Sequence, residues 1–250
     1  MLIDAHCHIT FLSEEEKKRI FSSYGTSHIF IDSSINYQST LASSKISSDY
    51  PFIYSALGFH PFYVRGFTPH ILKSYREIID KNKKIIAIGE IGLDDKAEAK
   101  LDEQENIFRI FLKLAKETNL PLIIHNRLHS RMLLGILDDF FNSYEKIVFH
   151  CFSYPADFLK KIIEKKGYIS FSLNILRKKK DITESLKECP LENLLLETDS
   201  PYMRIGDRAS TPLDIKEVYA YVTSLKGIEQ KKLEEIVFSN VKKVFGLLRE

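Results

Sequence analysis

Apolar positions recur along the chain in two alternating patterns. Short runs rich in β-branched residues and bounded by turn residues predict strands, and longer stretches with apolar residues at helical spacing predict helices. In 155–166, for example, Phe158, Leu159, Ile162 and Ile163 share one helical face, and Gly167 follows where a C-terminal cap is expected. The predicted strands are 2–7, 27–31, 52–58, 84–90, 120–125, 146–150, 167–172 and 193–198. The predicted helices are 13–24, 35–48, 69–82, 102–118, 129–143, 155–166, 180–188, 212–226 and 229–248.

This alternation of strands and helices predicts a parallel sheet with both faces covered. The strands are nearly continuous in hydrophobicity, which is typical of strands buried on both faces. For a chain of 250 residues we therefore predict an α/β fold, a (β/α)8 TIM barrel that forms a single domain over 1–250. An open doubly wound sheet is the alternative. No Gly-rich phosphate loop follows the first strand, which disfavours the nucleotide-binding versions of that sheet.

Composition narrows the function classes. Hydrophobic residues make up 44% and charged residues 28%, which are the proportions of a globular protein. The net charge of +2 argues against binding nucleic acid by charge alone. Three cysteines, at positions 7, 151 and 189, do not form a disulfide framework. With no signal-peptide pattern and no apolar run of membrane-spanning length, we expect a soluble, cytoplasmic protein that does not bind membranes.

Metal-ligating residue types stand at the ends of five predicted strands. They are His6, His8, Glu90, His125, His150 and Asp199. In a barrel, the carboxyl ends of the strands gather around one mouth, where active sites lie. His6 and His8 are two residues apart in a strand, so their side chains point to the same face and reach one ion, while Cys7 points away.

We interpret this set as a site for two divalent ions, with Mg, Mn or Zn as the candidates. His6, His8, Glu90 and Asp199 would bind one ion, and Glu90, His125 and His150 the other, with Glu90 as the bridge. Asp199 is then placed to act as a general base toward water. Each residue alone is more simply read as an ordinary polar side chain. Four histidines and two acids at one mouth would be costly to bury without a cation.

Candidate substrate-binding residues follow several of the predicted strands. We predict substrate contacts for His60, Arg127, Arg177 and Tyr202. The alternatives are a structural role for His60, solvated charges for the arginines and loop packing for the tyrosine. Further basic residues in these loops are Arg131, Lys178, Lys179, Lys180, Arg204 and Arg208, and further aromatic ones are Phe59, Phe62, Tyr63, Phe152 and Tyr154.

Further predictions concern four single residues. Asp94 either orients a ligand or caps a loop. His28, His70 and His129 are expected to be structural or solvated, away from the site.

Several motifs together resemble the TatD family of metal-dependent deoxyribonucleases, within the amidohydrolase-like metal hydrolases. The matching stretches are Asp4-Ala5-His6-Cys7-His8, Gly58-Phe59-His60-Pro61, Gly89-Glu90-Ile91-Gly92-Leu93-Asp94, Pro121-Leu122-Ile123-Ile124-His125, Phe149-His150-Cys151-Phe152-Ser153, Glu197-Thr198-Asp199-Ser200-Pro201-Tyr202 and Asn240-x-x-x-Val244-Phe245. The resemblance implies a (β/α)8 barrel, two divalent ions on the same six residues, and hydrolysis of phosphodiester bonds, often from the 3′ end of DNA. The chain departs from the family pattern at Asn126, Tyr154, Leu173 and the loop 208–212, all in substrate loops.

Three functions follow in order of preference. The first is a deoxyribonuclease of the 3′–5′ exonuclease type whose partner is DNA with single-stranded or frayed ends. The second is a small-molecule metallohydrolase that cleaves a phosphoester, lactone or amide at the same two-metal site. The bulk of Tyr154 and Leu173 would suit its narrower pocket. The third is a metal-stabilised scaffold without catalysis, which the intact ligand set and a placed acid disfavour.

Overall fold

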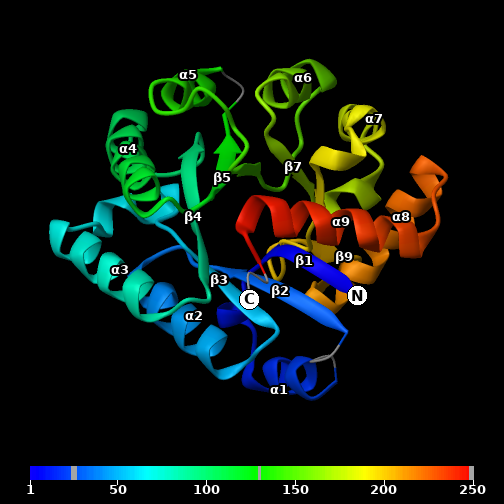
Figure 1. Cartoon of the computed structure of the whole chain (residues 1–250), viewed down its shortest axis with the longest axis horizontal. Helices are drawn as coiled ribbons and strands as arrows, with labels where there is room; N and C mark the ends of the chain where they lie inside the picture. Colours follow the sequence, from blue (N-terminus) through cyan, green and yellow to red (C-terminus); the bar gives the residue numbers. More distant parts are fainter. Residues whose placement is uncertain (24–26, 129–130, 248–250) are drawn as a thin grey trace.

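The strands form the barrel that the sequence predicts. The computed structural model describes residues 1–23, 27–128 and 131–247. Eight parallel strands pair in chain order in one sheet, and the helices surround it (Figure 1). Their bounds are β1 Leu2–Cys7, β2 His28–Ser33, β3 Ile53–Leu57, β4 Ile85–Asp94, β5 Leu122–Arg127, β6 Ile147–Phe149, β7 Tyr168–Phe171 and β8 Leu194–Leu196. Backbone hydrogen bonds from Asp199 N to His6 O (3.0 Å) and from His8 N to Ser200 O (2.8 Å) join the segment after β8 to the end of β1. The fold is therefore a (β/α)8 barrel, and the open sheet is excluded.

The helices lie close to their predicted positions. They are α1 Glu14–Ser23, α2 Tyr37–Asp49, α3 Pro69–Lys81, α4 Leu101–Thr118, α5 Met132–Asp138, α6 Ala156–Glu164, α7 Lys180–Glu188, α8 Ile215–Lys226 and α9 Gln230–Phe245. The helix predicted over 129–143 is shorter than expected, since α5 ends at Asp138. Positions 24, 129, 130 and 248 of the predicted helices lie outside the described residues. Asn240 of α9 donates hydrogen bonds to Leu191 O (2.7 Å) and Leu194 O (2.9 Å), so this helix is fastened to the start of β8.

Gly167 was predicted as the C-terminal cap of α6, and this prediction was wrong. The left-handed residue is Lys166, with φ of 65°, and not Gly167. Gly167 is required for another reason: a Cβ atom there would lie 2.5 Å from Cγ2 of Ile162. The glycine therefore permits close packing of the chain as it leaves α6.

Several short elements have no counterpart in the predictions. They are the hairpin of β9 (Arg204–Ile205) and β10 (Arg208–Ala209), and the 3₁₀ helices η1 Ile9–Phe11, η2 Pro61–Gly66, η3 Leu173–Arg177, η4 Leu191–Asn193 and η5 Pro212–Asp214. Segments of two to six residues are too short for a hydrophobic period to reveal them. Most of them follow the strands, so they shape the mouth of the barrel.

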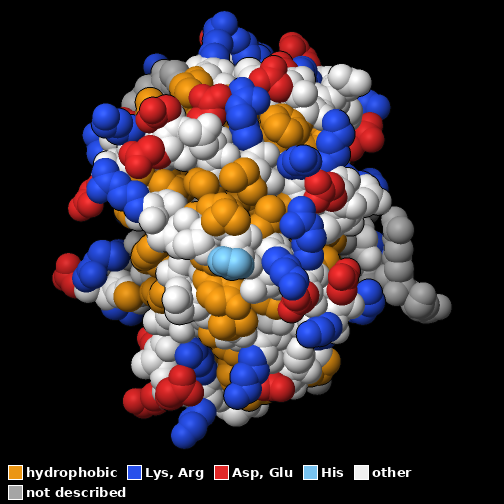
Figure 2. Space-filling view, turned by 90° about the vertical axis from the view of Figure 1, so that its left-hand side faces the viewer, with side chains coloured by type: hydrophobic (Ala, Val, Ile, Leu, Met, Phe, Trp, Pro, Cys, Tyr) orange, Lys and Arg blue, Asp and Glu red, His pale blue; other side chains and the backbone are white. Residues whose placement is uncertain are grey.

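Apolar residues fill both the barrel and the layer between its strands and helices. Ile3, Ile31, Ile88 and Ile124 of the strands are completely buried. Seen from the side of α3, apolar side chains gather in the middle of the surface and charged ones lie mostly around them (Figure 2). Among the described residues, no helix combines the length and the apolar character that crossing a membrane requires.

Candidate metal centre

The six predicted ligand residues meet at the mouth of the barrel. His6 lies in β1, Glu90 in β4 and His125 in β5, while His8 and His150 directly follow strands and Asp199 is the third residue after β8. All are buried except His125, which is half-buried. Glu90 does not stand at the end of its strand as predicted. It lies inside β4, where the pairing with β5 shifts register between Ile88 and Ile91.

A first group of ligand atoms has the spacing of a single metal site. The Nε2 atoms of His6 and His8 are 3.1 Å apart. Oε2 of Glu90 lies 3.4 and 3.5 Å from these two nitrogens, and Oδ1 of Asp199 lies 3.9 and 3.5 Å from them. Ligand atoms at about 2.1 Å from one ion in tetrahedral or octahedral geometry are about 3.0–3.4 Å apart. The ligand atoms of these four side chains therefore lie near the spacing of a single cation site, although three of the five distances are slightly longer than this range. His6, His8 and Asp199 form one candidate group for an ion.

A second group surrounds the other oxygen of the same glutamate. Oε1 of Glu90 lies 2.6 Å from Nδ1 of His125 and 2.8 Å from Nε2 of His150. These two nitrogens are 3.2 Å apart. Nε2 of His60 lies 3.5 Å from the same oxygen, so this histidine reaches the ligand cluster itself. Each oxygen of Glu90 thus faces a different pair of histidines, which is the arrangement that a bridging carboxylate needs.

Hydrogen bonds on the far side of the rings leave the facing nitrogens free to act as ligands. Nδ1 of His8 donates to the carbonyl oxygen of Ser33 over 2.7 Å. Nε2 of His125 donates to Oδ2 of Asp94 over 2.9 Å, and Lys96 N donates to Oδ1 of Asp94 over 2.7 Å. Asp94 therefore contacts a candidate ligand and also caps its loop, the two roles predicted as alternatives. A neutral imidazole that donates through one nitrogen offers a lone pair on the other.

The charges of the site suit a cation. Burial alone would raise the pKa of Glu90, but the nearby His150 and the contacts with His125 and His150 hold it well below its usual value. Burial likewise opposes ionisation of Asp199, yet its contact with His8 lowers its pKa overall. Burial and the neighbouring His125 lower the pKa of His60 to about 3, so its imidazole is neutral. Two carboxylates and a neutral imidazole therefore face the same space.

Two buried acids beside the site were not predicted. Oε1 of Glu197 accepts a hydrogen bond from Cys151 N (2.6 Å) and lies 3.4 Å from Nδ1 of His150. The carboxylate of Asp4 accepts hydrogen bonds from Thr198 N (2.9 Å) and Thr198 Oγ1 (2.6 Å). The spacing contains a signal for both, because Asp4 precedes His6 by two residues and Glu197 precedes Asp199 by two.

The mouth is a cavity of about 620 Å³. His60, Arg127, Arg177 and Tyr202, the predicted substrate residues, all line it. Of the other aromatic candidates, Phe62 and Tyr63 are exposed there, whereas Phe59 and Phe152 are buried.

Tyr154 has a packing role. Its hydroxyl accepts a hydrogen bond from Leu128 N (3.0 Å) and donates to the loop carbonyls, so it holds the loop after β5. His28 and His70 lie away from the mouth, on β2 and α3, and His129 lies outside the described residues.

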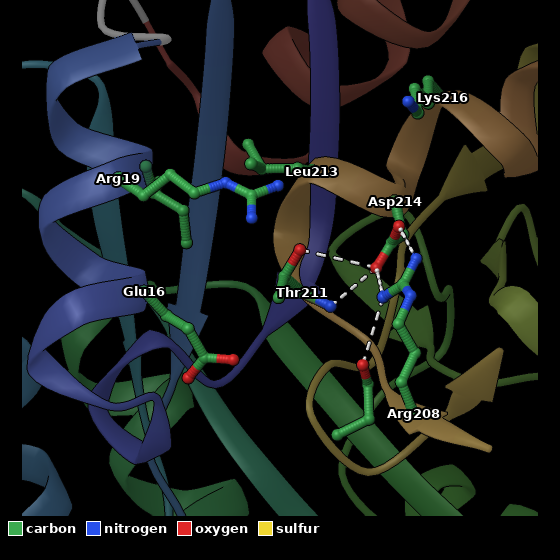
Figure 3. A pocket seen from close by; sticks show the side chains of 9 residues that line it. Glu16, Arg19, Arg208, Thr211, Leu213, Asp214 and Lys216 are labelled. Carbon is green, nitrogen blue, oxygen red and sulfur yellow. Dashed lines mark hydrogen bonds and ion pairs between the residues drawn. The ribbon is translucent and has the colours of Figure 1, made fainter.

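A second cavity of about 410 Å³ lies between α1 and the segment after β8 (Figure 3). Arg208 was among the further basic residues of the predicted substrate loops. Its guanidinium donates to both carboxylate oxygens of Asp214, at 2.6 and 2.8 Å. Asp214 also accepts a hydrogen bond from Thr211 N (2.8 Å). Arg208 therefore fixes the start of α8, and none of the six candidate ligands lines this cavity.

Known proteins are similar to this chain along most of its length. The family model of TatD-related DNases matches residues 3–246. An uncharacterized metal-dependent hydrolase of Methanocaldococcus jannaschii is 32% identical over 97% of this chain and 96% of its own length. A 3′-5′ ssDNA/RNA exonuclease TatD of Klebsiella pneumoniae is 27% identical over 85% of this chain and 84% of its own.

Solved structures show the same fold. The TatD homologue YjjV of Escherichia coli superposes with a TM-score of 0.90 at 23% identity, covering 98% of both chains. A TatD family hydrolase of Entamoeba histolytica gives 0.84 at 20% identity over 98% of this chain and 97% of its own. With the family model matching nearly the whole chain, this protein belongs to the family of TatD-related DNases and is a metal-dependent hydrolase.

Proposed function

We propose that this protein is a deoxyribonuclease of the 3′–5′ exonuclease type. The observation that carries the proposal is Glu90, whose two oxygens face two separate pairs of histidines, with Asp199 beside one pair. Two-metal sites of this kind suit in-line displacement at phosphorus. Relatives named 3′-5′ ssDNA/RNA exonucleases support DNA as the partner, with single-stranded or frayed ends as the form bound.

In this proposal, His6, His8, Glu90 and Asp199 hold one divalent ion, and Glu90, His125 and His150 hold the second, with Mg, Mn or Zn as candidates. Such ions supply Lewis acidity and lower the pKa of water toward neutrality. Asp199, ionised because His8 contacts it, accepts the proton of the attacking water. Arg127 and Arg177 line the mouth and bind phosphate oxygens, and neutral His60 donates a hydrogen bond to the substrate.

The rest of the proposal concerns the setting of the protein. We place the whole chain in one domain and the protein in the cytoplasm. Its cysteines, Cys7, Cys151 and Cys189, are free, as is usual in a reducing compartment.

The test is degradation of end-labelled single-stranded DNA by chelator-treated protein, with Mg²⁺ or Mn²⁺ added back. We expect a metal-dependent ladder that shortens from the 3′ end and is absent with Asp199→Asn. Asp207→Asn, in the exposed turn between β9 and β10, is the matched control and should keep wild-type activity. Folded protein that binds two ions and cleaves no DNA with any of the metals would overturn the proposal.

The small-molecule hydrolase is the second candidate, and the size of the mouth favours it. A cavity of about 620 Å³ is of the size that takes small ligands, and Tyr154 holds one of its walls. The dependence of KM on salt concentration distinguishes the nuclease from the small-molecule hydrolase. A nuclease loses affinity steeply with salt because phosphate contacts release counterions, whereas a small-molecule hydrolase responds weakly.

A further inference from the structure

Two aromatic side chains stand exposed beside the candidate metal centre. Phe11, the last residue of η1, is 42% exposed, and Tyr202, in the loop after β8, is 51% exposed. Their ring centroids are 6.3 Å apart, with the planes inclined by 49°. Burying either ring more fully would be favourable, so a pair of open aromatic faces at the rim of a site indicates a ligand surface.

Both rings lie against a candidate metal ligand. The ring of His8 is 4.9 Å from that of Tyr202 and 6.2 Å from that of Phe11, in edge-to-face arrangements. Nε2 of the same histidine is 3.5 Å from both Glu90 and Asp199. The aromatic pair therefore lies directly beside the proposed reaction centre, with His8 in contact with both.

Short backbone links tie each ring to the centre. Phe11 N donates to His8 O over 3.1 Å, and Met203 N, directly after Tyr202, donates to Asp199 O over 3.1 Å. Met203 is held in turn by Ser210, whose backbone nitrogen donates to Met203 O over 3.0 Å. Because these bonds position the segments that carry the two rings, little conformational entropy of the backbone is lost when a flat group stacks on their exposed faces.

We propose that Phe11 and Tyr202 form a stacking site, the slot, on whose exposed ring faces the terminal nucleobase of the strand stacks while its phosphodiester lies at the metal centre; this rests on the proposed nuclease function. The slot offers π-faces and, in its walls, one phenolic hydroxyl. It therefore selects a flat base without selecting which base. A base still paired and stacked in a duplex cannot enter, so the slot also accounts for a preference for single-stranded or frayed ends.

The test compares two single-stranded oligonucleotides that differ only at the 3′-terminal residue, which carries a base in one and is abasic in the other. A base stacked on an aromatic ring contributes about 1–3 kcal/mol, which is about 5- to 150-fold. We expect wild-type protein to have a kcat/KM lower by such a factor on the abasic strand. Phe11→Ala should lower kcat/KM on the base-bearing strand toward the abasic value and leave the abasic strand unchanged.

Further variants separate stacking from packing. Phe11→Leu keeps apolar bulk without a π-face and should behave as Phe11→Ala, whereas Phe11→Trp should restore the preference for the base. Phe62→Ala removes another exposed aromatic ring of the mouth, next to His60, and should change both strands by the same factor. Equal losses on both strands with Phe11→Ala, or a base-dependent loss with Phe62→Ala, would overturn the slot.

Binding separates the failure of the slot from the failure of the nuclease function. In the Asp199→Asn background, fluorescence anisotropy should show Phe11→Ala weakening the base-bearing strand alone. Wild-type protein that cleaves both strands without regard to the terminal base overturns the slot and leaves the nuclease proposal standing. Protein that cleaves neither strand overturns the nuclease proposal, and equal affinity for the two strands then overturns the slot as well.

Discussion

His125 donates from Nε2 to Oδ2 of Asp94 over 2.9 Å, across the ends of β5 and β4. This bond turns Nδ1 of the same ring toward Glu90, which lies 2.6 Å away. The other facing nitrogens of the centre, in His6, His8 and His150, are Nε2 atoms. Among these four histidines, His125 faces the centre through Nδ1, and Asp94 holds its ring through the opposite nitrogen.

Replacing Asp94 by asparagine should therefore weaken metal binding without unfolding the barrel. An amide accepts a hydrogen bond less strongly than a carboxylate, and loss of such a partner typically costs 10- to 100-fold in metal affinity, about the factor we expect here. Titration of chelator-treated protein with Mn²⁺ or Zn²⁺, followed by calorimetry, measures it. Asp95→Asn changes the neighbouring acid and should titrate as wild type. Unchanged affinity in Asp94→Asn would show that this bond does not orient the ring for a ligand role.

Metal removal should lower thermal stability. Four histidines and two acids converge in a mostly buried space, and an ion that binds the folded chain alone stabilises it by about 2.7 kcal/mol at 100 times its dissociation constant. For a chain of this size that corresponds to a rise in Tm of about 5–10 °C. Differential scanning fluorimetry with a chelator, and then with Mn²⁺ or Zn²⁺ in excess, measures the rise. Asp199→Asn should reduce it, and a Tm insensitive to metal would contradict the ligand assignment.

Much of this arrangement could be read from the sequence because two simple periodicities carry it. Buried strands are visible in the sequence as apolar runs, such as Ile85–Ile88 in β4. In a (β/α)8 barrel the carboxyl ends of the strands lie together at one mouth. The pair His6 and His8 follows from strand alternation alone. Glu90 was located correctly at the site but wrongly at the end of its strand, because a register shift inside β4 leaves no sequence pattern.

Other features depend on contacts between distant segments. Phe11 and Tyr202 are 191 positions apart in the sequence, and nothing local marks them as a pair. Glu197 ends an apolar run and reads as the polar end of a strand, yet it is buried against Cys151 and His150. Phe11 and Glu197 were missed because their surroundings exist only in the folded barrel, and Tyr202 was predicted as a substrate contact but not as the neighbour of Phe11.

Asp32 should make the free energy of unfolding depend on pH. Its carboxyl is completely buried, and burial raises its pKa from 3.8 to about 6, despite a hydrogen bond with Ser43 and the nearby His8. Below pH 4 the group is protonated in both folded and unfolded chains. Above pH 6 it is charged in both, so the folded state bears the cost of a buried charge, about 3 kcal/mol for a shift of about two units.

The contribution of Asp32 should therefore lower the free energy of unfolding of the wild type as pH rises from about 4 to above 6. Asp32→Asn removes this contribution, so its stability relative to wild type should increase between pH 5 and pH 8. Urea unfolding with a chelator present measures the difference at each pH. Asp49→Asn, exposed at the end of α2, should follow the wild-type dependence. A constant difference between Asp32→Asn and wild type across this range would contradict the assignment.

Two glycines offer a matched test of how the backbone positions His125. Gly92 pairs with His125 in the sheet, its φ is +151°, and a Cβ atom there would lie 1.8 Å from the carbonyl oxygen of His125. Gly66 is exposed at the end of η2, and a Cβ atom there would meet no neighbouring atom of the described residues within 4 Å. Gly92→Ala must push β4 away from β5, whereas Gly66→Ala removes chain entropy from the unfolded state alone.

We expect Gly92→Ala to lower the free energy of unfolding by about 3 kcal/mol or more, since both the steric overlap and the positive φ oppose an alanine. Gly66→Ala should change it by less than about 1 kcal/mol. Urea unfolding gives both values. Because β4 and β5 carry Glu90 and His125, Gly92→Ala should also weaken Mn²⁺ binding, measured by calorimetry on the fraction that folds. Wild-type stability and metal affinity in Gly92→Ala would mean that the two strands can separate without disturbing the candidate centre, and the rigid placement of His125 would then be wrong.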